Sequence, residues 1–531
     1  MERGENGESV IGIGNPQLLQ RVLELAQKSH EAKKSKSEEK ELSPEAKAEL
    51  EELRSKLENE MDDVVEQFKG RLLRLLDWRK GFGDPPEHAR GGFACVLLDK
   101  ELRVAYRLEP MRNQVDAAAW LAFHVVLEMF GTRAAASVAM DKPGAVMTAD
   151  RVMTTSSPHE MWNDTSIVRC YQEPTLAAFS RHVVKHRNRL LRKGSSHNGG
   201  LIVAGEESGR GQSRLLTPRL WFWHRIEMPV LPEVENGTIT ENDKTRRVRG
   251  RELADVLCVH DAGGRNPHGE TRSVRLLCTV FDLGTTDLAT VSRSSWQGGA
   301  PEEVPVKVVN DIGLALRCMH ACGVAHGDVK MANILRIGDG YWLGDLPALT
   351  RATTKMLTND PLCSTQLVTG KRMLSNDMWG LGLITISLLA GSAPFKRTCD
   401  KFKKILPPQS SGPLWVIFAA GVLHTLSHLV PGERVLFETA RSLRQLIQAP
   451  VGRKMIRPIS RESREICRAE GEIAARQLLK HKAAPKLWTQ IAYCLDVSNV
   501  ARNALAMPLP GEEGMQDDDH YDSNEDKGAE D

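Results

Sequence analysis

The sequence predicts an α+β protein, and three observations lead to that class. Runs of β-branched and aromatic residues at 93–98, 103–108 and 220–226 are typical of strands. A stripe of apolar residues at helical spacing follows Pro44, and further segments of helical period lie after residue 300. The chain has 531 residues, of which 41% are hydrophobic and 26% charged, which is the composition of a soluble protein with several domains.

Charge is distributed unevenly along the chain. Lys and Arg number 71 and Asp and Glu number 69, so the net charge is +2. Residues 511–531 contain ten acidic residues and one Lys, which leaves the rest of the chain mildly basic. A segment this polar cannot offset the entropy of ordering, and we expect a disordered acidic tail at 511–531. The basic excess elsewhere is too small to indicate nucleic acid as a partner.

The ten cysteines are scattered and form no Cys-x-x-Cys pair. A disulfide framework is typical of small, Cys-dense secreted chains, and the first residues, MERGENGESV, lack the apolar core of a signal peptide. The longest apolar runs are shorter than the ~20 residues that cross a bilayer. We therefore expect no membrane association, and a location in the cytoplasm or the nucleus.

Residues 1–80 are predicted to form a helical extension. Ser43, Pro44 and Glu45 supply an N-cap, a first-turn proline and an early acid in series. Apolar residues then recur every three or four positions, at Leu50, Leu53, Leu57, Met61, Val64, Phe68, Leu72 and Leu75. This stripe favours a helix that packs on the next domain, and its near-heptad spacing leaves coiled-coil pairing with a protein partner as the alternative.

Residues 81–279 combine the predicted strands with Gly-, Ser- and Asn-rich stretches that are typical of loops. Two basic clusters lie here, at 181–193 and 244–251. A solvated helix face and a loop explain them, and a nucleic-acid or localisation patch is the sharper alternative. A buried strand is predicted at 273–284, helices at 308–319 and 379–390, and a further helical segment at 458–505.

Four polar residues form the most informative pattern. Asp328, Lys330 and Asn333 lie in a loop between a predicted helix and an apolar strand, and Asp345 follows twelve residues after Asn333. A strand, a turn and a returning strand fit between them, so we expect a hairpin that brings Asn333 and Asp345 together. Amide and carboxylate oxygens are ligands that Mg²⁺ prefers. Asp328 could accept a hydroxyl proton, and Lys330 could neutralise a phosphoryl group.

The segment His326–Leu335, with Gly344-Asp345-Leu346 after it, resembles the catalytic loop H-R-D-x-K-x-x-N and the D-F-G motif of eukaryotic protein kinases. Other landmarks follow in the order of that family. Residues 377–382 resemble D-x-W-x-x-G, 391–395 resemble G-x-x-P-F, and 431–434 resemble P-x-x-R. Upstream, residues 280–288 resemble the hinge and the start of the next helix.

The resemblance implies a bilobal protein-kinase-like fold with a mainly helical C-lobe, added to the helical N-terminal extension. It divides the chain into an extension (1–80), a divergent N-lobe with insertions (81–279), a C-lobe (280–450), a helical segment (451–510) and the tail (511–531). It implies ATP and Mg²⁺ as cofactors and protein Ser/Thr hydroxyls as acceptors. Asp328 would be the catalytic base, Lys330 would stabilise the γ-phosphate, Asn333 and Asp345 would hold magnesium, and the backbone at Val280 and Leu283 would receive adenine.

The phosphate-covering loop is expected at Gly91 and Gly92, because Arg90–Val96 is similar to G-x-x-F-G-x-V. Val104–Arg107 is similar to V-A-x-K, so Arg107 stands where the ATP-anchoring lysine belongs, with Glu128 as its candidate carboxylate partner.

Three departures from the family pattern bear on activity. Gly327 replaces the loop arginine, Leu346-Pro347 replaces Phe-Gly, and no A-P-E follows. These departures keep a second hypothesis open, a pseudokinase that acts as a scaffold or binding module. A third hypothesis is a small-molecule phosphotransferase of the same fold, against which the D-x-W-x-x-G segment counts.

Cys318, His320, Cys322 and His326 have a spacing that imitates a zinc site. Residues two apart on a helix do not face one another, so we interpret these side chains as core packing.

Overall fold

The structure is a computed structural model of the chain. The residues that it describes are 44–76, 88–90, 95–110, 118, 120–124, 126–127, 181–188, 199–201, 213–229, 271–322, 324–346, 374–392, 394, 397, 412–450, 453, 456–457, 459–498 and 504–510. The expectations for the tail at 511–531 and for the basic cluster at 244–251 lie outside these residues.

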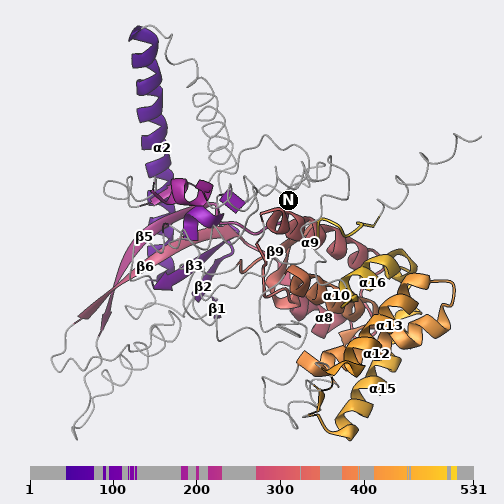
Figure 1. Ribbon diagram of the computed structural model, residues 1–531. Coiled ribbons are helices and arrows are strands. Elements are labelled where there is room, and N and C mark those ends of the chain that lie inside the picture. Colours follow the sequence, from indigo (N-terminus) through magenta and orange to yellow (C-terminus); the bar gives the residue numbers. More distant parts are fainter. Residues whose placement is uncertain are drawn as a thin grey trace, which may run out of the picture.

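An antiparallel sheet of six strands forms one part of the molecule (Figure 1). The strands are β1 (His88–Arg90), β2 (Cys95–Asp99), β3 (Val104–Pro110), β4 (Gly199–Leu201), β5 (Leu220–Pro229) and β6 (Thr271–Asp282). Their order is β1-β2-β3-β6-β5-β4, so β6 lies centrally between β3 and β5 although about 160 residues separate it from β3. The strands predicted at 93–98, 103–108, 220–226 and 273–284 are confirmed as β2, β3, β5 and β6.

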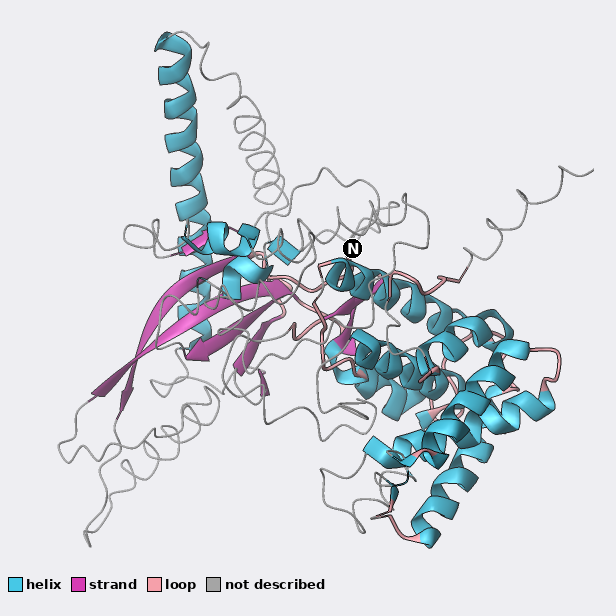
Figure 2. Ribbon diagram, in the orientation of Figure 1, coloured by secondary structure: helices cyan, strands magenta, loops and turns pink. Residues whose placement is uncertain are grey.

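The long helix α2 (Pro44–Leu76) covers one face of this sheet with its C-terminal half (Figure 1). It begins at the proline that the sequence marks as the first helical position. Val64, Phe68 and Leu72 are buried against the sheet, and Phe68 meets the ring of Tyr106 edge-on at 6.4 Å. The predicted packing of this helix on the next domain is therefore confirmed. Its N-terminal half projects beyond the sheet in Figures 1 and 2.

Helices make up the second part of the molecule (Figure 2). They are α8 (Leu288–Ser295), α9 (Glu303–Ala321), α10 (Leu374–Ala390), α12 (Gly412–Leu429), α13 (Arg434–Gln448), α15 (Arg461–Leu478) and α16 (Trp488–Leu495), with short 3₁₀ turns η3 (Met331–Asn333) and η6 (Ala484–Leu487). All but one of the residues of α10 are buried, so this helix forms the centre of the helical part. A helix apolar on all sides is expected in such a position.

A small hairpin lies between the sheet and the helices. It consists of β8 (Ile334–Ile337) and β9 (Gly340–Leu343), with β7 (Thr286–Asp287) added at the edge of β8. The Asp311 carboxylate of α9 accepts from the Tyr341 N–H at 2.9 Å and pairs with Arg214 at 3.1 Å. Segment 213–217, which leads into β5, also bonds to the β9 residue Leu343. The hairpin is thereby fixed to both parts.

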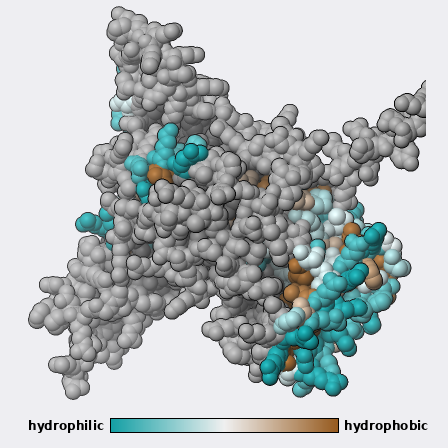
Figure 3. Space-filling view, in the orientation of Figure 1, coloured by the Kyte–Doolittle hydropathy of each residue, from teal (hydrophilic) through white to brown (hydrophobic). Residues whose placement is uncertain are grey.

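The described architecture is α+β, as the sequence predicts. Residues 181–188 of the first basic cluster form a helix that buries Val183 and exposes most of its polar residues, which agrees with the expected solvated helix face. Figure 3 shows mainly hydrophilic residues on the visible described helices, with some hydrophobic residues exposed among them. Within the described part of the chain, no helix is both long and apolar enough to cross a membrane.

Candidate functional site

The loop between α9 and β8 gathers the three polar side chains that the sequence singles out. The Lys330 ammonium donates to Asp328 Oδ2 at 2.7 Å. The Asn333 amide NH₂ donates to the same oxygen at 3.1 Å and to the Asp328 backbone carbonyl at 2.9 Å. A carboxylate held by two donors on its own loop has a fixed orientation.

Asp377, in the first turn of α10, binds the backbone of this loop through hydrogen bonds. Its carboxylate is 1% exposed and accepts from the backbone N–H groups of His326 and Gly327, each at 2.7 Å. It also contacts His320 Nε2 at 3.0 Å. Buried charges are stable only when hydrogen-bonded in this way. Asp377 thus ties the backbone of the loop between α9 and β8 to the central helix.

The two histidines of this network have defined tautomers. His320 Nδ1 accepts from the Ala504 N–H at 2.9 Å, so its proton lies on Nε2 and is donated to Asp377. His326 Nδ1 accepts from the Asp328 N–H at 3.2 Å, so its Nε2–H donates to the Gly344 carbonyl at 3.0 Å. Both ring nitrogens of each histidine are therefore engaged. Within the described part of the chain, no group of three Cys, His, Asp or Glu side chains is arranged to hold a metal.

Backbone geometry explains one departure from the family pattern. Gly327 has a φ of 74°, in the left-handed region that a side chain disfavours. Close approach explains another glycine, Gly380 of α10, where a Cβ would lie 2.8 Å from the Val329 carbonyl oxygen. The loop is therefore pressed against α10 at this point.

The predicted hairpin is confirmed and brings the ends of its two arms together. Ile334 pairs with Leu343, and the Gly344 N–H donates to the Asn333 carbonyl at 2.8 Å. Asp345, the next residue, adopts a φ of 53°, a conformation that Asp tolerates better than most residues. Its side chain is 55% exposed and faces the sheet, where Arg107 donates to its Oδ1 at 3.3 Å.

Arg107 comes from β3, and its surroundings are the part of the site that the sequence did not reveal. Its guanidinium lies 3.6 Å from Glu109 Oε2 and 5.6 Å from the centre of the Trp120 ring. Residues 107 and 109 alternate with the α2-facing residues 106 and 108, so both project from the opposite face of the sheet. This alternation is visible in the sequence and could have identified Glu109 as a neighbour of Arg107. Glu128, the partner expected from the sequence, lies outside the described residues.

Burial shifts the pKa values of two groups beside Arg107. Glu109 is 3% exposed, and neither of its carboxylate oxygens has a hydrogen-bond partner among the described residues. Burial raises its pKa, and the attraction of Arg107 only partly opposes this. Burial also lowers the pKa of His124 to about 3, and the nearby Arg107 contributes to the decrease. His124 donates through Nδ1 to the Trp120 carbonyl at 3.0 Å, and its lowered pKa favours the neutral imidazole near pH 7.

Comparisons with known proteins bear on these motifs. No protein-family model matches the chain. A MAP kinase-activated protein kinase of Caenorhabditis elegans is 34% identical over 132 residues, which are 23% of this chain and 25% of the relative. CBL-interacting protein kinase 4 of Oryza sativa is 32% identical over 156 residues, 26% of this chain and 33% of the relative. A CBL-interacting serine/threonine-protein kinase of Arabidopsis thaliana is 26% identical over 226 residues, 39% of this chain and 48% of the relative.

The chain is related to the protein kinase superfamily. The matched segments span from a quarter to about half of the length of these relatives. Only part of this chain is thus matched to serine/threonine kinases.

The backbone groups of Val280 and Leu283, which the sequence assigns to adenine binding, already form hydrogen bonds with other backbone groups. Val280 lies within β6, pairs with Tyr106 and Leu220, and its carbonyl accepts from the Arg219 N–H at 2.7 Å. The Leu283 N–H donates to the Arg103 carbonyl at 3.0 Å. Adenine binding at these groups requires an exchange of hydrogen bonds. Gly91 and Gly92 follow β1, and both lie outside the described residues.

The donor set fits a magnesium nucleotide in its chemistry. The Asn333 NH₂ points to Asp328, so its amide oxygen is the atom that could coordinate a cation. The exposed Asp345 carboxylate is a second oxygen donor. Mg²⁺ in phosphotransferases uses one or two such protein oxygens and completes its shell with water and phosphate. The cationic Arg107 and Lys330 flank these oxygens from β3 and from the loop.

Proposed function

We propose that the chain is a serine/threonine protein-kinase-like phosphotransferase with two lobes. In this proposal the sheet with α2 is the smaller lobe and the helical part is the larger one, with a boundary near residue 280. The substrates are ATP and a protein hydroxyl group. The relationship to serine/threonine kinases supports the reaction class.

Asp328 is proposed to accept the proton of the attacking hydroxyl. Its Oδ2 is held by Lys330 and Asn333, which fixes the orientation of the carboxylate that would receive the proton. Lys330 is proposed to stabilise charge on the transferring phosphoryl group, since its ammonium lies beside the carboxylate that receives the hydroxyl.

Asn333 and Asp345 are proposed to hold Mg²⁺, and Arg107 to contact the nucleotide phosphates. Magnesium held by these oxygens would supply positive charge that offsets the charge of the phosphates. Arg107 carries the positive charge that lysine supplies in the family, and its planar guanidinium can bind two phosphate oxygens at once. The contact of Arg107 with Asp345 at 3.3 Å supports a site to which both elements contribute.

The observation that carries this proposal is the hydrogen-bonded set of Asp328, Lys330 and Asn333 at the base of the hairpin that ends in Asp345. The test is transfer of labelled γ-phosphate from Mg-ATP to a generic protein substrate by the wild-type chain and by Asp328→Asn. We expect the variant to lose about 10²-fold or more in rate, the effect of removing a general base. Asp339→Asn is the matched control, because Asp339 is 86% exposed at the hairpin turn. Equal background labelling by all three proteins would refute catalysis.

A second candidate function is a non-catalytic scaffold of the kinase fold. The observation in its favour is that the Asp345 carboxylate is paired with Arg107 and the Leu283 N–H with Arg103. A protein that keeps these contacts would not accept a nucleotide. A melting temperature unchanged by Mg-ATP, together with background phosphotransfer, would favour this candidate over the enzyme.

A further inference from the structure

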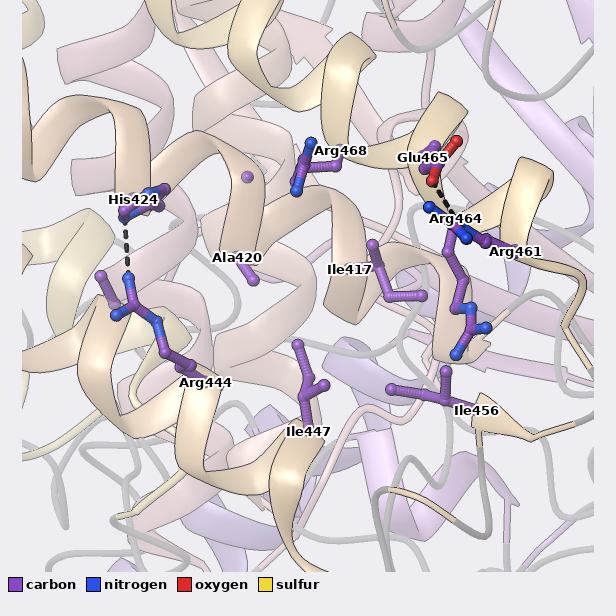
Figure 4. Close-up of a pocket in the computed structure, with 12 residues that line it drawn as sticks. Ile417, Ala420, His424, Arg444, Ile447, Ile456, Arg461, Arg464, Glu465 and Arg468 are labelled. Carbon is purple, nitrogen blue, oxygen red and sulfur yellow. Dashed lines mark hydrogen bonds and ion pairs between the residues drawn. The ribbon is translucent and has the colours of Figure 1, made fainter.

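A groove of about 550 Å³ lies between α12, α13 and α15, on the helical part (Figure 4). Its floor is apolar and includes Ile417, Ile447 and Ile456. Four arginines line it, Arg444 from α13 and Arg461, Arg464 and Arg468 from the first half of α15. We call it the arginine groove.

The arginine groove has an excess of positive charge. Among the described residues that line it, Glu465 is the one carboxylate, and it pairs with Arg461 at 2.9 Å. Arg468 lies 3.6 Å from Glu472, one turn further along α15. Among the described residues, Arg444 and Arg464 have no carboxylate partner, and both are exposed to solvent.

His424, on α12, shows the effect of this charge. Arg444 donates to His424 Nδ1 at 2.9 Å, which requires the nitrogen to be unprotonated (Figure 4). Burial lowers the pKa of His424, and Arg444, His428 and Arg468 lower it further, while Glu472 opposes them. The cations around the groove thus outweigh the anions at this position.

The chain itself contains a segment of matching composition. Residues 511–531 carry ten acidic residues and one Lys. Asp517, Asp518 and Asp519 are consecutive, and the apolar Met515 and Tyr521 flank them. An anionic run between two apolar side chains matches arginines above an apolar floor.

The segment starts from a fixed point on the same helical part. Leu509 is 5% exposed within the core, and Arg317 of α9 donates to the carbonyls of Ala504 and Met507. The 21 residues of 511–531 can extend up to about 70 Å. Helix α12, which forms one wall of the groove, has 18 residues and a length of about 27 Å.

We propose that the acidic segment 511–531 docks in the arginine groove of its own chain. Attachment to the same chain gives it an effective concentration in the millimolar range, so weak exposed ion pairs suffice to hold it. The contact weakens with salt, because the guanidinium groups are largely exposed. This inference is independent of phosphotransfer and holds for an enzyme and a scaffold alike.

The test uses zero-length carbodiimide crosslinking of the full chain carrying Arg464→Lys. This variant keeps the positive charge and supplies an amine that couples to a neighbouring carboxylate. Mass spectrometry of an equal mixture of ¹⁵N-labelled and unlabelled chains separates links within one chain from links between chains. Arg434→Lys is the matched control, because Arg434 is 88% exposed on α13 and does not line the groove.

We expect crosslinks between Lys at position 464 and residues 511–531 of the same chain. The yield of such crosslinks from Lys at position 434 should be at least several-fold lower. Replacing Asp517, Asp518 and Asp519 with Asn should lower the yield about fivefold or more, since each exposed pair contributes a factor of roughly two. Equal yields from positions 464 and 434 would overturn the proposal. Links found only between chains would also overturn it and would identify the groove as a contact between copies.

Discussion

The two sides of the candidate site differ in how their buried polar groups are satisfied. On the helical side, Asp377 accepts three hydrogen bonds, and both histidines that touch its loop use both ring nitrogens. On the sheet side, the Arg107 guanidinium lies 3.6 Å from Glu109 Oε2. Neither oxygen of Glu109 has a hydrogen bond within the described part of the chain.

This difference indicates which side can change when a ligand arrives. A fully bonded network is costly to alter, whereas the buried Glu109 carboxylate has no hydrogen bond to lose when Arg107 moves. In the proposed function, the loop with Asp328 is therefore preformed, and Arg107 is the group that would exchange Asp345 for a nucleotide phosphate.

Asp377→Ala should produce the largest effect. It leaves the N–H groups of His326 and Gly327 and the ring of His320 without an acceptor in a buried site. We expect a loss of about 3–5 kcal/mol in the free energy of unfolding, measured with urea. Asp339→Ala, at an exposed carboxylate, should cost less than about 0.5 kcal/mol. A loss below about 1 kcal/mol for Asp377→Ala would show that this network does not hold the loop.

Two buried carboxylates of the sheet should respond in opposite ways. Asp99 accepts from Arg71 at 2.6 Å and from the N–H groups of Glu101 and Leu102. Asp99→Asn should therefore cost about 2–3 kcal/mol at neutral pH. Glu109→Gln should change stability by less than about 1 kcal/mol, because Glu109 has no hydrogen bond to lose. Equal losses from both variants would contradict the contrast.

The pH dependence of the free energy of unfolding gives an independent check of the contrast between Asp99 and Glu109. Burial would raise the pKa of Asp99, but the hydrogen bonds from Arg71 and the backbone outweigh it and lower the pKa. Its contribution is present above the unfolded-state pKa and is lost as pH falls through the folded-state value. Glu109 has a raised pKa, so its effect on stability becomes less favourable as pH rises through its titration range. Urea unfolding from pH 3 to 7 measures both slopes.

His124 should make the sheet side sensitive to mild acid. Its pKa is lowered to about 3, from 6.5, so the unfolded chain binds a proton below pH 6.5 that the folded chain does not. We expect stability to fall by about 2 kcal/mol between pH 7 and pH 5 from this group. His124→Gln should flatten the profile, while the exposed His428→Gln should keep it. An unchanged profile for His124→Gln would show that His124 is not buried in the neutral form.

Gly327→Arg, which introduces the residue usual in the family, should have a small effect. At a φ of 74° a side chain costs about 1 kcal/mol. We expect a small decrease in melting temperature, measured by calorimetry. A stabilised variant would mean that the loop adopts another conformation.

Local patterns predicted most of the elements. The start of α2 at Pro44, the strands β2, β3, β5 and β6, and the hairpin of β8 and β9 all follow from capping, alternation and loop length. These features depend on residues that are close together in the sequence.

The surroundings of Arg107 and Asp377 depend on contacts between distant residues. Arg107 and Asp345 are 238 residues apart, and His320 and Asp377 are 57 apart. Composition and periodicity give no pairing of this kind, so His124 was missed as a neighbour of Arg107, whereas the alternation along β3 could have identified Glu109. The arginine groove escaped notice for the same reason, since its arginines come from two helices and its floor from three segments.

Mg²⁺-dependent binding of ATP, measured by isothermal titration calorimetry on the wild-type chain and on Asp345→Asn, tests the proposed site most directly. We expect binding to the wild type that requires Mg²⁺ and is lost or weakened at least tenfold by the substitution, because Asp345 is proposed to supply a metal-binding oxygen. Wild-type binding that is absent, or equally strong with and without Mg²⁺, would contradict the proposed site.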